Sequence, residues 1–168
     1  MDILIRPVRV EDSEDISEIR RMKGVMENIL VIPSERLEGS IRFTESLGND
    51  DHVFVAEVNE DGVKKVVGLA GLHLSKSARQ RHSGSLGICI HTGYQNMGIG
   101  KKLLDEILDI ADNWLMLVRV ELGVYTDNEK AIGLYKSLGF EKEGIKKYSA
   151  IRNGKYVDEY MMARYNIK

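Results

Sequence analysis

The chain has 168 residues, of which 43% are hydrophobic and 30% are charged, values that are typical of a water-soluble domain. Its formal net charge of −2 gives no electrostatic reason to expect binding to nucleic acid or to an acidic membrane surface. A single cysteine excludes an internal disulfide framework.

The first third of the chain predicts a strand followed by two helices. Apolar and polar residues alternate over residues 3–10, as they do in a half-buried strand. Asp12 is a candidate N-cap for the first helix, whose apolar residues recur at helical spacing. The second helix is expected to begin near Pro33, because proline suits a first helical turn, and to run toward Leu47.

Three strands are expected next. Segments 52–58 and 63–74 flank Asp61-Gly62, a pair that is typical of a tight hairpin turn. A third strand is expected over residues 83–91, where apolar residues again alternate.

A glycine-rich stretch, GYQNMGIGKKLL, follows that strand and leads into a long helix. The apolar residues of this helix recur at helical spacing as far as Trp114. A strand comes next, and then a short helix that is expected to be capped by Asp127 and closed by Gly139. Two final strands flank the hairpin signal Asn153-Gly154.

The order βααβββ-loop-αβαββ predicts an α/β (α+β) domain. Its sheet is expected to be mixed and mostly antiparallel, with helices on both faces. No linker or internal repeat divides the chain, so we expect one domain over residues 1–168.

The glycine-rich stretch would place free backbone N–H groups at the positive end of a helix dipole, which suits a phosphate. Gly93 and Gly98 have the spacing of a P-loop, but Ile99 stands where that motif needs lysine. Gly98 and Gly100 fit a dinucleotide fingerprint, but Leu103 stands at its third glycine. Both better-known phosphate motifs therefore fail, and a plain glycine-rich turn remains an alternative.

The residues around those glycines point elsewhere. Gln95, Gly98 and Gly100 fill the fixed positions of Gln/Arg-x-x-Gly-x-Gly/Ala, and Asn128 and Tyr135 follow in NEKAIGLYKSLGF. Together they resemble the acyl-CoA loop and the neighbouring segment of the GNAT superfamily of N-acetyltransferases. The element order fits too, so the resemblance covers nearly the whole chain. ADNWL and the tail KKYSAIRNGKYVDEYMMAR are similar to bacterial L-amino-acid N-acetyltransferases of that superfamily.

The resemblance implies a GNAT fold and an acyltransferase that moves an acetyl group directly from acetyl-CoA, its cosubstrate, to a primary amine of a small molecule, such as an amino acid. Protein or peptide N-terminal acetylation, polyamine acetylation and a non-catalytic acyl-CoA sensor are the alternatives. The resemblance assigns coenzyme binding to Ile88, Cys89, Ile90, Gln95, Asn96, Met97, Gly98, Ile99, Gly100, Lys101 and Asn128. Lys101 and Lys102 are equally well explained as solvated helix residues.

Tyr135 stands where members of the superfamily carry the general acid, and a phenol with a pKa of about 10 stays protonated at neutral pH. His91, His73 and Glu121 are candidates for the base, and each is also well explained as a structural residue. Cys89 is expected to act as a small apolar residue and not as an acetylated nucleophile, because no Cys-His-Asp arrangement is readable. No metal site is expected.

The resemblance implies that the acceptor enters from the face opposite the coenzyme, between residues 22–37 and the last hairpin. The start of the chain carries no apolar signal-peptide core, and no apolar run is long enough to span a bilayer. We therefore expect a cytoplasmic protein that binds neither membrane nor nucleic acid. A homodimer is compatible with the resemblance, because members often pair through a sheet edge or their C-terminal strands.

Overall fold

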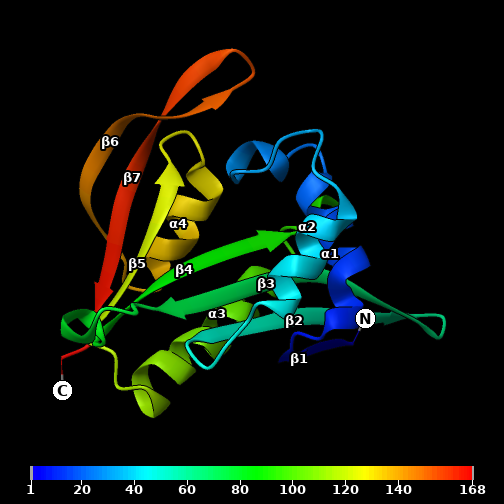
Figure 1. Cartoon of the computed structure of the whole chain (residues 1–168), viewed down its shortest axis with the longest axis horizontal. Coiled ribbons are helices and arrows are strands. Elements are labelled where there is room, and N and C mark those ends of the chain that lie inside the picture. The colour runs from blue at the N-terminus through cyan, green and yellow to red at the C-terminus, as the bar shows by residue number, and fades with distance from the viewer. Residues whose placement is uncertain (1, 168) are drawn as a thin grey trace.

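A single seven-stranded sheet organises the computed structural model, which describes residues 2–167 (Figure 1). The strand order is β1-β2-β3-β4-β5-β7-β6, and the strands pair antiparallel except for β4 and β5. The predicted element order and the mixed, mostly antiparallel sheet are confirmed. The strands and helices are β1 (Ile3–Pro7), α1 (Ser13–Arg21), α2 (Leu37–Glu45), β2 (Asp51–Glu60), β3 (Val63–Leu74), β4 (Ser83–Ile90), α3 (Ile99–Asp109), β5 (Arg119–Tyr125), α4 (Glu129–Ser137), β6 (Glu141–Arg152) and β7 (Lys155–Tyr165).

Helices cover both faces of the sheet, as the alternating strands require. Helix α1 packs Ile16 and Ile19 against Val66 and Leu69 of β3 on one face. Helix α3 packs its apolar side on the opposite face, where the larger core also takes in α4 (Figure 1). Strand β3 presents Val66 and Leu69 to one core and Val67 and Ala70 to the other, and its register with β2 shifts between Ala56 and Glu57.

The ends of the first two helices differ from the prediction. Asp12 precedes α1, but its carboxylate accepts hydrogen bonds from the Arg6 side chain and from the Arg9 backbone N–H, not from the helix. Helix α2 begins at Leu37 and not near Pro33, and it stops at Glu45, before Leu47. Proline is permitted in a first turn, but it does not by itself start a helix there.

Two later helix ends also need correction. Helix α3 stops at Asp109 and continues as a π-helical turn over Ile110–Trp114, which carries Trp114 out of the apolar stripe and leaves it 75% exposed. The N-cap of α4 is Asn128 and not Asp127, because the Asn128 side chain accepts from the Ala131 backbone N–H.

Both predicted hairpin turns are confirmed. Asp61 and Gly62 have φ values of 51° and 86°, and Asn153 and Gly154 have 50° and 75°. Left-handed conformations at both central positions are those of a type I′ turn, which Asn-Gly and Asp-Gly favour.

The sheet opens at its one parallel junction, and this opening positions the site. Strands β4 and β5 pair only where Ser83–Ser85 meet Arg119–Glu121. Beyond those residues the two strands diverge, with α4 beside the gap on the side of α3 (Figure 1). Among residues 2–167, no helix has the length and apolar character needed to cross a membrane.

Candidate active site

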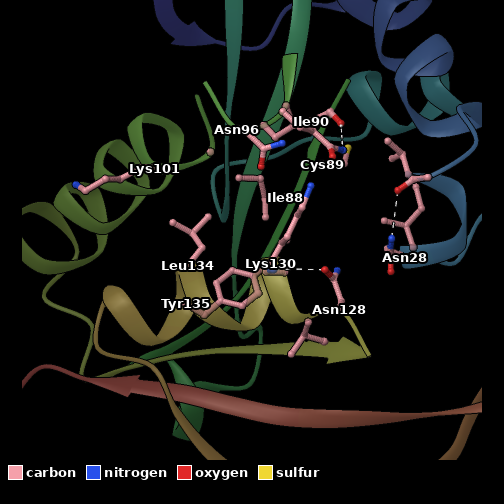
Figure 2. Close-up of a pocket in the computed structure, with 18 of the residues that line it drawn as sticks. Asn28, Ile88, Cys89, Ile90, Asn96, Lys101, Asn128, Lys130, Leu134 and Tyr135 are labelled. Carbon is pink, nitrogen blue, oxygen red and sulfur yellow. Dashed lines mark hydrogen bonds between the residues drawn. The ribbon is translucent and has the colours of Figure 1, made fainter. Parts of the chain in front are cut away.

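The opening between β4 and β5 holds a cavity of about 640 Å³. One wall is the diverging part of β4, which carries Ile88, Cys89 and Ile90 (Figure 2). Gly123 and Val124 of β5 also line the cavity. The remaining walls come from the glycine-rich loop, from α4 and from the segment after α1. Segments that are far apart in the sequence therefore meet around one space.

Strand β4 turns an unpaired backbone edge toward this cavity. Its other edge pairs with β3 from Gly84 to Ile90. On the β5 side, pairing within the described chain ends at Ser85, so the backbone of Leu86–Ile90 faces the cavity. Free N–H and C=O groups on an unpaired strand edge can bind an extended, amide-containing ligand in the way another strand would.

The glycine-rich loop ends at the N-terminus of α3, beside the same cavity. Gly98 has φ +77° and Asn96 has φ +63°, so the loop depends on left-handed conformations that glycine and asparagine tolerate. Gln95 pins the loop to β4 by donating from Nε2 to the Ile90 carbonyl at 3.1 Å. The first-turn N–H groups of α3 have no intrahelical partner and can meet an anion.

Gly100 has a different role from Gly98. A Cβ at Gly100 would lie 3.3 Å from Cδ2 of Leu134, so the small residue lets α3 approach α4 closely. A Cβ at Gly98 would meet nothing within 4 Å, so the requirement there is conformational.

Of the eleven residues assigned to the coenzyme, all but Met97 and Ile99 line the cavity. Met97 is 51% exposed outside the cavity lining, and Ile99 is buried in the core. Lys101 contributes to the lining, but its ammonium pairs with Asp105 at 2.7 Å and points away from the cavity (Figure 2).

Tyr135 comes from α4 and lines the cavity (Figure 2). Its ring packs against that of Phe140. Burial, and then the neighbouring Cys89, raise the pKa of Tyr135 to about 12. The phenol is therefore protonated at neutral pH and available as a proton donor.

Cys89 lines the same cavity on β4. Burial raises the pKa of its thiol to about 12. Because the thiolate is the nucleophilic form, a thiol with so high a pKa is a poor nucleophile at neutral pH.

None of the three candidate bases lines the cavity. His91 accepts from the Gly93 N–H through Nδ1 and approaches Glu18 through Nε2 at 3.4 Å. His73 pairs with Asp51 at 2.7 Å, and the carboxylate of Glu121 pairs with Arg119 at 2.8 Å. His91 adjoins the cavity through its neighbour Ile90, whereas His73 and Glu121 stand on stretches of β3 and β5 outside it.

Several lining residues were not singled out from the sequence, although Asn28 lies within residues 22–37, which were expected at the acceptor entrance. Lys130 extends from α4 into the cavity, and Asn28 faces it from the segment after α1 (Figure 2). The position of Lys130 between Asn128 and Tyr135 was a usable signal, but no motif marks Asn28. Within the described residues, no group of three or more His, Cys, Asp and Glu side chains could hold a metal ion.

Comparison with known proteins agrees with this geometry. Residues 20–140 match the model of the acetyltransferase (GNAT) family. An L-amino acid N-acetyltransferase, AaaT, of Escherichia coli is 36% identical over 97% of this chain and 98% of its own length.

Solved structures show the same fold. A ribosomal-protein-alanine N-acetyltransferase from Brucella melitensis superposes with a TM-score of 0.82 at 26% identity, covering 97% of this chain and 99% of its own. A spermidine N-acetyltransferase from Vibrio cholerae, solved in complex with CoA and spermine, has a TM-score of 0.82 at 24% identity, covering 97% and 95%. With the family match spanning most of the chain, the protein belongs to the GNAT family of acetyltransferases.

Proposed function

We propose that the protein transfers an acetyl group from acetyl-CoA directly to the amino group of a free amino acid. One observation carries the proposal: the free edge of β4, the amide-rich loop and the protonated hydroxyl of Tyr135 share one cavity. The similarity to AaaT, which covers nearly the whole of both chains, supports an amino acid as the acceptor.

The loop and β4 would hold the coenzyme. The N–H groups of Asn96–Lys101, at the start of α3, suit its pyrophosphate. The free edge of Ile88–Ile90 suits the amide groups of the pantetheine arm and can donate to the thioester oxygen. When bound, the coenzyme supplies an activated acetyl group as a thioester.

In the transfer itself, β4 N–H groups stabilise the negative charge that develops on the thioester oxygen as the amine attacks the carbonyl carbon. The carbon–sulfur bond breaks, and the Tyr135 hydroxyl gives its proton to the departing thiolate. The nitrogen loses one proton to solvent as the amide forms, and solvent returns a proton to Tyr135. Cys89 takes no covalent part, because its thiol stays protonated.

The acceptor side favours an amino acid with an apolar side chain. Val25 and Ile29, in the segment after α1, line the cavity opposite the coenzyme loop. Leu30 and Ile32 are 84% and 64% exposed and do not line it. A small apolar wall suits a side chain such as that of methionine or phenylalanine.

Thermal unfolding followed by a thiol-release assay tests the function. Acetyl-CoA should raise the melting temperature, because it binds only the folded protein. Turnover with the twenty amino acids, spermidine and a short peptide should be highest for an apolar amino acid. A protein that is not stabilised by any acyl-CoA contradicts coenzyme binding, and turnover confined to spermidine or the peptide contradicts the amino-acid acceptor. Stabilisation without turnover on any amine would favour a sensor.

The proposal extends to a cytoplasmic homodimer that is a single domain. Strand β6 forms an edge of the sheet and carries the exposed side chains of Ile145, Tyr148 and Ile151, which supports pairing through the last hairpin. Light scattering after size-exclusion chromatography should give twice the mass of one chain, and Ile145→Lys should shift it toward the monomer.

A further inference from the structure

Beside the cavity, on the acceptor side, β7 places a carboxylate against the wall of β5. Glu159 is paired in register with Tyr125, two residues beyond Gly123. A Cβ built on Gly123 would lie 1.6 Å from Oε1 of Glu159, so the carboxylate occupies the space where any other residue would have its side chain. Gly123 lines the cavity and Glu159 does not, so the carboxylate reaches the cavity wall only through its position over Gly123.

A bulge in β6 fixes the other oxygen of this carboxylate. The register of β6 and β7 shifts between Lys146 and Ala150, and Tyr148 in this stretch has φ +51°. Asp158 holds the bulge by accepting from the Tyr148 N–H at 2.9 Å. The bulge turns Ser149 toward Glu159, and the Ser149 hydroxyl donates to Oε2. Such bulges recur beside active sites, where they re-aim a side chain.

Two cations stand near Glu159. Lys146 lies opposite it in register on β6 but forms no ion pair with it within residues 2–167, and Arg152 is paired elsewhere. The guanidinium of Arg152 donates to the carboxylate of Asp127 and lies over the ring of Tyr125, with 5.6 Å from Cζ to the ring centroid. Its remaining contact is with the Glu27 carbonyl at 3.4 Å. Within residues 2–167, the ion pairs include none to Glu159, so its Oε1 is available to a ligand.

Resting on the proposed amine acetyltransferase function, we propose that Glu159 binds the amino group of the acceptor. Oε1 accepts a hydrogen bond from the amine, while Ser149 holds Oε2 and Gly123 leaves room for the carboxylate. A hydrogen bond to an ionised carboxylate is stronger than a neutral one, and its direction orients the donor. Glu159 is thus an acceptor-binding residue that selects an amine and presents its nitrogen to the cavity.

Steady-state kinetics with the amino acid that the wild-type enzyme turns over fastest test this assignment. Glu159→Gln keeps the shape and can still accept from Ser149, but it loses the charge. Gly123→Ala forces the carboxylate off its position. Both variants should raise the KM for the acceptor at least tenfold while the KM for acetyl-CoA stays within twofold. Glu141→Gln, which removes an exposed carboxylate from β6, is the matched control and should change neither constant.

The two hypotheses fail in different ways. If the KM of Glu159→Gln for the acceptor is within twofold of the wild-type value, the assignment of Glu159 is overturned. The proposed function still stands in that case, provided that the wild-type protein acetylates the amino acid. A wild-type protein that binds acetyl-CoA but acetylates no amine in the panel overturns both. Stabilisation of each variant by acetyl-CoA shows that it is folded, and Glu159→Gln alone decides the outcome if Gly123→Ala does not fold.

Discussion

At the scale of single residues, burial raises the pKa values of two side chains in the cavity, and the chemical consequence differs between them. The pKa values of Tyr135 and Cys89 are both raised to about 12, mainly by burial. A tyrosine that stays protonated remains able to donate, whereas a cysteine that stays protonated is a weak nucleophile. One apolar environment therefore favours proton donation to the leaving group over a covalent acetyl-enzyme.

Replacing Tyr135 by phenylalanine removes the proton donor and keeps the ring that packs on Phe140. Turnover should fall about 100-fold or more, because a positioned general acid typically contributes about 10²–10⁴ in rate. Stabilisation by acetyl-CoA should persist. Tyr156→Phe, at a residue that is 67% exposed, is the matched control. Wild-type turnover in Tyr135→Phe would remove this residue from the role of acid.

Cys89→Ala should keep turnover within a few fold of the wild-type value, because a thiol with a pKa of about 12 is protonated at the pH of the assay. The check is a thiol-release assay combined with mass spectrometry of wild-type protein that has been quenched during turnover. An acetyl group found on Cys89, together with loss of activity in the alanine variant, would exclude direct transfer.

At the scale of elements, the start of α4 determines where Tyr135 stands. The Asn128 side chain accepts from the Ala131 N–H at 3.3 Å and thereby caps the helix. Asn128→Ala should lower the free energy of unfolding by about 1 kcal/mol, as loss of an N-cap typically does. Asn128→Ser, which can still cap, should recover most of this loss in urea denaturation. Equal stabilities of the alanine variant and the wild-type protein would show that the cap contributes nothing.

Element order could be predicted from the sequence because it follows from local patterns. Alternation marks strands, and Asp61-Gly62 and Asn153-Gly154 adopt the backbone angles that their own chemistry favours. Helix ends were less predictable. The turn at Ile110–Trp114 is π-helical, which no local pattern marks. The carboxylate of Asp12 accepts from Arg6 of β1 and does not cap α1, so its role depends on a contact outside the helix.

The two sides of the candidate site differ in the same way. The coenzyme side depends on the backbone of one continuous stretch, so the spacing of Gln95, Gly98 and Gly100 was enough to locate it. The acceptor side depends on registers between β5, β6 and β7 and on a bulge, and nothing near Glu159 in the sequence marks it. The candidate bases His91, His73 and Glu121 were chosen mainly by residue type, and none of them lines the cavity.

At the scale of the whole molecule, an ion network ties the first strand to the sheet. Arg6 of β1 binds Asp12 at 2.8 Å and Glu57 of β2 at 2.7 Å, and the three side chains are only 11%, 8% and 10% exposed. Burial acts to raise the pKa of Asp12, but hydrogen bonds from Arg6 and from the Arg9 backbone outweigh it and leave the pKa lowered. The hydrogen bond from Arg6 likewise lowers the pKa of Glu57.

Arg6→Leu should therefore destabilise the protein in a pH-dependent way. A carboxyl group whose pKa is lower in the folded than in the unfolded state stabilises the folded protein at pH values above its unfolded pKa, which is about 4. This stabilisation is lost as the pH falls through the pKa of the folded state. At pH 7 the variant should lose about 2 kcal/mol of unfolding free energy, less than the roughly 3–5 kcal/mol lost at fully buried pairs. The difference in unfolding free energy between the variant and the wild-type protein should narrow in urea denaturation as the pH falls below about 4, because protonated Asp12 and Glu57 no longer need the cation. Arg81→Leu, at the more exposed pair with Asp50, should change stability little at either pH. A difference that is constant with pH would mean that the loss comes from packing of the Arg6 stem and not from its charge.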